Sequence, residues 1–194
     1  MKYITVFIAT ILLNFLSVNT NAQRIKTKSG DLSVLKNETA INIEFAYDNM
    51  SVGKYDNESE YLEKKKAEYN SKEPGRGDRW VKNWVADRKS SFEPKFIDLF
   101  ERNSGMTTKS DAKYSLIFHT TSTEPGYYIY ISKKNAEIDA EVTIVETANR
   151  SKVIAVITIS NAPGRTFSGE DWATGDRIAE SYAVSGKRLG KYIK

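Results

Sequence analysis

Residues 137–160, EIDAEVTIVETANRSKVIAVITIS, decide the fold class of this chain. The runs 137–147 and 152–160 are typical of two β-strands, and the turn-forming residues ANRS between them predict a hairpin. Two more strand candidates precede this pair with no helix in between, at 114–119 and 127–131. Strands that follow one another in this way favour an antiparallel sheet.

Helical patterns flank this strand region on both sides. A stripe of large apolar residues recurs at three- and four-residue spacing upstream, made of Trp80, Val81, Trp84, Val85, Phe92, Phe96, Ile97, Leu99 and Phe100. Pro94 suits the first turn of a second segment, so we expect a kink near Ser90. The closing helix is expected to open with a capping box at 168–171 and to lay an Ala- and Gly-rich face closely on the sheet.

Two elements precede the upstream helices. Apolar and polar residues alternate over 40–48, which predicts a half-buried strand. Asn57 and Glu60 predict the N-cap of a charged helix that continues to Asn70. The expected order is therefore β-α(α)-β-β-β-α. This order predicts a single α+β domain over 40–194, with an antiparallel sheet of four to five strands and helices packed on one face.

The first 22 residues have the layout of a secretory signal peptide. A cationic start, an apolar run from Tyr3 to Val18 and a small residue at the end predict cleavage between Ala22 and Gln23. The alternative is a membrane anchor, but the run is shorter than the roughly 20 residues of a spanning helix. Residues 23–39 are expected to form a flexible lead-in, to which Leu32, Val34 and Leu35 could add a short edge strand. We therefore expect an exported protein, periplasmic or extracellular, with no transmembrane segment in the mature chain.

Composition excludes several kinds of chemistry. The chain has no cysteine and one histidine, so the sequence offers no thiolate nucleophile, no iron–sulfur cluster and no typical catalytic zinc site. The net charge of +4 over 194 residues is ordinary and carries no nucleic-acid signature. We therefore expect no cofactor, no metal, no nucleic-acid partner and no catalytic residue.

An aromatic stretch beside two lysines is the strongest candidate for a ligand surface. Tyrosines next to cations can hold a carbohydrate or a single-stranded nucleic acid, and export argues against the latter. Tyrosine is also an ordinary strand residue, so a strand without a ligand explains the same pattern. If the sheet binds a ligand, we expect the contacts at Tyr127, Tyr128, Tyr130 and Lys133.

Two short motifs have a structural explanation beside a functional one. Arg76-Gly77-Asp78 matches the integrin-binding tripeptide in a turn rich in Gly and Pro, but Asp78 also suits the N-cap of the helix that follows. His119 is the residue type of a general base, but it lies on the strand face opposite to Leu116 and Phe118. No nucleophile motif accompanies it, which favours a sheet histidine without a catalytic role.

Acidic and tryptophan patterns also favour structural roles. Asp56, Glu58 and Glu60 alternate as calcium ligands do, but the glycine and the distal glutamate of an EF-hand are missing. An acidic helix start explains these residues better. The tryptophans could form an exposed platform, but the helical spacing of Trp80 and Trp84 favours core packing, and Trp172 lies near Ile178 in the last helix.

The layout also carries a resemblance. The phrase DAKYSLIF at 111–118, the hairpin at 145–153 and the closing amphipathic helix resemble small periplasmic modules of bacterial envelope proteins, of the CsgG-like and TolB N-terminal-like kinds. The chain also resembles uncharacterised secreted proteins of Bacteroides-type bacteria. Unlike the lipoprotein members, it has no cysteine to acylate. The resemblance implies a role in assembly or protein contact, and it carries over no catalytic residue.

Three hypotheses for function follow. The first is an exported, non-catalytic binding or assembly module of the cell envelope with an envelope protein as its partner. The second is a secreted small-ligand or glycan-binding protein that uses the aromatic sheet surface, which requires an open sheet face. The third is an enzyme that acts through His119 and neighbouring carboxylates.

Overall fold

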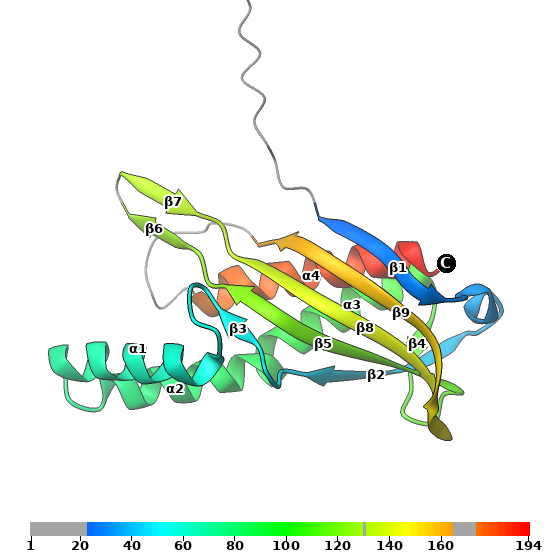
Figure 1. Cartoon of the computed structure of the whole chain (residues 1–194), viewed down its shortest axis with the longest axis horizontal. Coiled ribbons are helices and arrows are strands. Elements are labelled where there is room, and N and C mark those ends of the chain that lie inside the picture. The colour runs from blue at the N-terminus through cyan, green and yellow to red at the C-terminus, as the bar shows by residue number, and fades with distance from the viewer. Residues whose placement is uncertain (1–22, 130, 165–173) are drawn as a thin grey trace, which may run out of the picture.

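A seven-stranded mixed sheet forms the centre of the molecule. The computed structural model describes residues 23–129, 131–164 and 174–194. The sheet has the order β1-β9-β8-β5-β2-β4, and β3 also pairs with β5 (Figure 1). Its strands are β1 (Arg24–Gly30), β2 (Ala40–Ala46), β3 (Ser51–Val52), β4 (Thr107–Thr108), β5 (Tyr114–Glu124), β8 (Glu137–Glu146) and β9 (Asn149–Pro163). A separate two-stranded ribbon consists of β6 (Tyr127–Ile129) and β7 (Ser132–Lys134).

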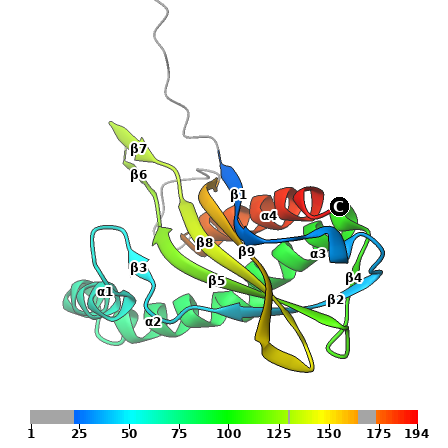
Figure 2. The same ribbon diagram turned by 45° about the vertical axis from the view of Figure 1, so that its right-hand side comes forward.

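The helices fall into two groups. Helices α3 (Glu93–Ser104) and α4 (Thr174–Tyr192) lie side by side against one face of the sheet (Figures 1 and 2). Helices α1 (Glu58–Lys72) and α2 (Arg76–Asp87) pack on each other beyond one end of the sheet. A π-helical turn at Arg88–Phe92 joins α2 to α3, at the place where the sequence predicts a kink. The α+β class and the helices on one face are as predicted.

The purely antiparallel sheet expected from the sequence is wrong. Strand β2 runs parallel to both β5 and β4, and β3 also runs parallel to β5. The reason is the helical region α1–α3, which lies between β2 and β5 in the chain. It returns the chain to the end of the sheet where β2 began, and a parallel neighbour needs such a crossover. The β5–β8–β9–β1 part is antiparallel, as the hairpin pattern predicts.

The small residues of α4 face a different partner from the one expected. A Cβ on Gly186 would lie 2.2 Å from the carbonyl oxygen of Phe96, and one on Gly190 would lie 2.7 Å from that of Phe100. Glycine therefore lets α4 approach the backbone of α3, whereas the sequence reading placed this close approach on the sheet.

Aromatic rings fill the space between the helices and the sheet. The ring of Phe96 lies 4.7 Å from that of Phe118 and 5.3 Å from that of Phe45, both in edge-on geometry. Phe96 and Phe118 are fully buried, as are Leu116 and Ile157 from the same sheet face. This core holds α3 and the sheet as one body.

The expectation of a flexible lead-in at residues 23–39 is also wrong. Arg24–Gly30 is the edge strand β1, which pairs with β9, and Ser33–Leu35 form a 3₁₀ turn that buries Leu35. The strand forms because the long β9 leaves its outer edge open for pairing. Residues 1–22, the expected capping box at 168–171, Tyr130 and Trp172 lie outside the described residues. Within those residues, no helix has the length and apolar character to cross a membrane.

Candidate ligand-binding groove

The aromatic stretch singled out from the sequence is not part of the large sheet. Strands β6 and β7 pair with each other in a ribbon that projects past the ends of β5 and β8 (Figure 1). Tyr127 is in register with Lys134, and Tyr128 with Lys133. Lys133 is exposed, and Tyr130 lies outside the described residues. The expected aromatic surface therefore belongs to a ribbon, because the turn after β5 separates these strands from β5 and β8.

A buried arginine fixes the base of this ribbon. The guanidinium group of Arg177 in α4 donates hydrogen bonds to the carbonyl oxygens of Pro125 and Gly126, at 3.2 and 3.4 Å, and to Oγ1 of Thr174 at 2.9 Å. Arg177 is only 1% exposed. No pattern in the sequence points to Arg177, because a lone arginine at the start of a helix gives no sign of burial. These hydrogen bonds fix the position of the ribbon relative to α4.

Two adjoining hollows lie beside the α1–α2 pair, one toward this ribbon and one toward the start of α4. The hairpin-side hollow, about 270 Å³, has Tyr127 and Lys134 on one wall and Tyr55 on the other. The helix-side hollow, about 230 Å³, is lined by α2. The two hollows share Tyr69, Trp80 and Thr174 in their linings, so they lie next to each other as one composite groove. We name it the aromatic groove, after the six rings that line it: Tyr55, Tyr61, Tyr69, Trp80, Trp84 and Tyr127.

The groove rings form a connected cluster. Trp80 and Trp84 are stacked, with centroids 5.4 Å apart, and Trp80 lies 5.6 Å from Tyr69. Tyr61 lies 5.2 Å from Trp84, and Tyr55 lies 5.8 Å from Tyr61. Trp84 is buried, as expected, whereas Trp80 is half-buried and Tyr127 is 44% exposed. The buried rings form the floor, and the partly exposed rings are available to a ligand.

The Arg76-Gly77-Asp78 motif is the first turn of α2 and is not a displayed loop. The backbone of Gly77 approaches α1 so closely that a Cβ there would lie 2.1 Å from the carbonyl oxygen of Lys66. Asp78 forms an ion pair with Lys66 at 2.8 Å, and this contact lowers the pKa of the Asp78 carboxyl group. The N-cap predicted at Asp78 is wrong, because α2 begins two residues earlier, after Gly75. The motif therefore joins the two helices that form the groove wall.

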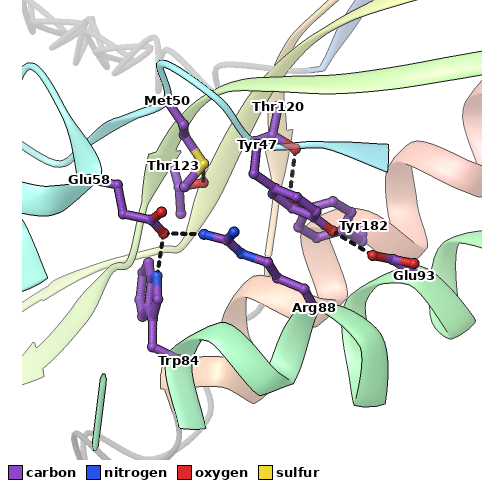
Figure 3. Close-up of polar contacts among 9 residues, drawn as sticks. All are labelled: Tyr47, Met50, Glu58, Trp84, Arg88, Glu93, Thr120, Thr123 and Tyr182. Atoms are coloured by element: carbon purple, nitrogen blue, oxygen red, sulfur yellow. Dashed lines mark hydrogen bonds and ion pairs between the residues drawn. The ribbon is translucent and has the colours of Figure 1, made fainter. Parts of the chain in front are cut away.

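A polar network lies behind the groove (Figure 3). Glu58 in α1 accepts hydrogen bonds from the indole N–H of Trp84 and from the guanidinium group of Arg88. That guanidinium lies 4.3 Å from the ring centre of Tyr47, which immediately follows β2. The Tyr47 hydroxyl donates to Glu93 at 3.4 Å. The π-helical turn points Arg88 inward, so this arginine links α1 to the body of the protein.

Burial controls the tyrosine chemistry of this network. Desolvation raises the pKa of Tyr47 far above its ordinary value, with further increases from Tyr182 and Glu93. Burial likewise raises the pKa of Tyr182, although its hydroxyl group lies 2.7 Å from Oγ1 of Thr120. Both phenols therefore stay neutral at any physiological pH and serve as hydrogen-bonding groups.

The acidic stretch before α1 has a structural role. Asn57 caps α1 by accepting a hydrogen bond from the backbone N–H of Glu60 at 3.0 Å, as the sequence predicts. Glu58 points to Arg88, whereas Asp56 is exposed. Across residues 23–129, 131–164 and 174–194, no group of three histidine or acidic side chains is arranged to hold a metal ion.

His119 lies on the sheet face that α3 and α4 leave uncovered. Its Nε2 is 2.7 Å from the carbonyl oxygen of Asp48, a contact that secures the turn between β2 and β3. The row across the sheet continues through Glu141, Thr158 and Lys26. The row at the position of His119 is therefore polar, and the partly exposed aromatic rings Trp80 and Tyr127 lie elsewhere, in the groove.

Comparisons with known proteins give only distant structural likenesses. No family model matches the sequence, and no curated protein does. The PelC dodecamer from Paraburkholderia phytofirmans is similar at 11% identity and a TM-score of 0.40, over 84% of this chain and 97% of that chain. A DUF330 protein from Xanthomonas campestris is similar at 9% identity and a TM-score of 0.36, over 80% and 84%. Scores at this level assign no function.

Proposed function

We propose that this chain is an exported, non-catalytic binding module of the bacterial cell envelope that holds a carbohydrate in the aromatic groove. The observation that carries the proposal is the convergence of six aromatic rings on one open depression. They come from α1, α2, the β3–α1 connection and the β6–β7 ribbon. Three of them, Tyr55, Trp80 and Tyr127, are partly exposed although they are far apart in sequence, and exposed rings that converge in this way are typical of a ligand site.

Carbohydrate is the ligand class that such a surface suits. One face of a sugar ring is made of C–H groups that pack on an aromatic ring, while its hydroxyl groups need polar neighbours. Trp80, Tyr55 and Tyr127 offer partly exposed rings, and Asn83 and Thr174 add polar groups to the lining. Each hollow alone is smaller than the roughly 300 Å³ at the lower end of ligand pockets, so a ligand with more than one ring suits the pair better.

Tryptophan fluorescence tests this proposal directly. The full chain, expressed with its leader and purified after export, is titrated with neutral and acidic oligosaccharides while its tryptophan emission, to which Trp80 and Trp84 contribute, is followed. We expect saturable quenching, and we expect Trp80→Ala to weaken binding about tenfold or more, because one stacking platform is lost. Tyr192→Ala, an exposed aromatic change outside the groove lining, is the matched control. Equal affinities of the Trp80→Ala and wild-type proteins would refute the groove as the site.

An envelope protein partner is the second candidate, and one observation favours it. Ile131, at the end of the β6–β7 ribbon, is 88% exposed. An isolated two-stranded ribbon is only marginally stable in water, so a partner protein bound over this end would stabilise it. We expect Ile131→Ser to remove a specific partner from envelope pull-downs while Val153→Ser, an exposed change on β9, retains it. The same partner retained by Ile131→Ser would count against this role.

A further inference from the structure

The aromatic groove is bordered by cations. Five basic side chains line it, and they come from both walls: Lys54, Lys65, Arg76, Arg79 and Lys134. Two carboxylates line it, Asp87 and Glu124. The groove therefore has a local excess of positive charge, although the charge of the whole chain is mild.

Two of these cations have no carboxylate partner among the described residues. Lys54 and Arg76 form no ion pair within that part of the chain, whereas Lys134 binds Glu124 at 2.6 Å and Arg79 binds Glu73. Instead, Lys54 lies 5.7 Å from the ring centre of Tyr55, and the guanidinium of Arg76 lies 5.1 Å from that of Tyr69. Each of these two cations, which have no ion pair within the described part of the chain, lies beside an aromatic ring of the groove.

The two unpaired cations are divided between the two hollows. Lys54 lines the hairpin-side hollow and Arg76 lines the helix-side hollow, on either side of the shared Trp80. Each hollow therefore combines a cation with an aromatic lining, and the partly exposed ring of Trp80 is common to both. The same pair of features repeated along a groove suits a chain in which successive rings each carry a negative charge.

Asp87 is the groove carboxylate that could oppose an anionic ligand. Its pKa is raised, first by burial and then by the neighbouring charge of Asp176. A raised pKa means that the charged form of this carboxyl group is disfavoured in its surroundings. Glu124 is already neutralised by Lys134. Asp87 lines only the helix-side hollow, so among the described lining residues no unpaired carboxylate shares the hairpin-side hollow with Lys54.

We infer that the groove binds an acidic oligosaccharide, with sugar rings stacked on its aromatic side chains and carboxylate or sulfate groups held by Lys54 and Arg76. This inference rests on the proposed carbohydrate function and names its ligand class. Uronic acids and sulfated sugars share the required chemistry, a ring with an anionic substituent. Arginine and lysine both bind such groups, and arginine can do so through two parallel N–H donors.

The test compares ligands that differ only in charge. The exported full chain is titrated with a galacturonic acid tetramer, with the same tetramer as its methyl ester, and with a sulfated oligosaccharide of equal length. We expect the acidic tetramer to bind about fivefold to tenfold more tightly than its ester. The preference should decline as salt is raised, because exposed charges are screened. Comparison of the uronate and sulfate arms identifies which anion the site prefers.

Variants show which side chains cause the preference for the acidic tetramer. Lys54→Gln combined with Arg76→Gln should remove the preference for the acidic tetramer and leave ester binding unchanged. Lys82→Gln, an exposed cation of α2 outside the groove lining, should change neither. All three residues are exposed, so the variants should retain the thermal midpoint of the wild type, which circular dichroism checks.

The outcomes separate the two proposals. Equal affinity for acid and ester, with binding that still depends on Trp80, would overturn the acidic-ligand inference and keep the carbohydrate function. A charge preference that survives in the double variant would also overturn it. No binding of any tetramer would overturn both.

Discussion

The body and the groove end of this protein are held together in different ways. In the body, α3, α4 and the sheet bury apolar and aromatic side chains, with Phe96, Phe118 and Ile157 fully inaccessible. At the groove end, α1 and α2 meet through tilted and edge-on aromatic rings and an ion pair, and they are linked to the body through Glu58 and Arg88. Apolar packing therefore determines the body, whereas the groove wall combines packing of Tyr61 and Trp84 on the core with polar contacts.

The largest loss of unfolding free energy is expected from a mutation in the body. Phe96→Ala should lower the free energy of unfolding by about 3–5 kcal/mol, because it opens a cavity among Phe45, Phe100 and Phe118. Ile131→Ala, at the exposed end of the ribbon, should change it by less than about 0.5 kcal/mol. Urea unfolding followed by circular dichroism measures both. A loss below about 1 kcal/mol for Phe96→Ala would contradict the core described here.

Loss of the link between the two regions should have an intermediate effect. Arg88→Ala leaves Glu58 in a site where its side chain is 19% exposed, and it removes the cation from the ring of Tyr47. We expect a loss of about 2 kcal/mol in unfolding free energy. We also expect Arg88→Ala to speed up amide hydrogen exchange, relative to the wild type, more in α1 than in α3.

The control for this link is an exposed pair on α3. Arg102 binds Asp98 one helical turn away, and its side chain is 70% exposed. Arg102→Ala should therefore cost less than about 1 kcal/mol. If the two alanine variants lose the same stability, Arg88 does not connect the groove wall to the body.

The smallest expected effect is a dependence of the unfolding free energy on pH, which comes from an ion pair on the open sheet face. Arg150 lowers the pKa of Glu44, by hydrogen bonds first and by its charge as well. A carboxyl group with a lowered pKa in the folded state stabilises the protein above its ordinary value of 4.5, and this stabilisation is lost as the pH falls. Because the pair is partly exposed, the gain should stay below about 1 kcal/mol.

Arg150→Gln measures this effect. The difference in unfolding free energy between this variant and the wild type should be largest at pH 7 and should shrink as the pH is lowered toward 3. A difference that stays constant over this range would mean that the Glu44–Arg150 pair is not its source.

Local patterns in the sequence identify the class of the fold and several of its details. The α+β class, the β8–β9 hairpin, the interruption between α2 and α3 and the Asn57 cap all follow from spacing and turn chemistry over a few residues. These features depend on neighbours in the chain, so periodicity and capping rules describe them well. The aromatic and cationic character of residues 127–134 was also visible, but the surface they belong to was not.

The parallel crossover and the groove depend on contacts between distant parts of the chain. Tyr127 reaches the same groove as Tyr55 and Trp80 because buried Arg177 of α4 holds the turn at Pro125 and Gly126. No local pattern shows that an arginine will be buried or which carbonyl groups it will bind. The composition and spacing of residues therefore set the elements and their order, while side-chain packing between those elements decided how they meet and where a ligand can bind.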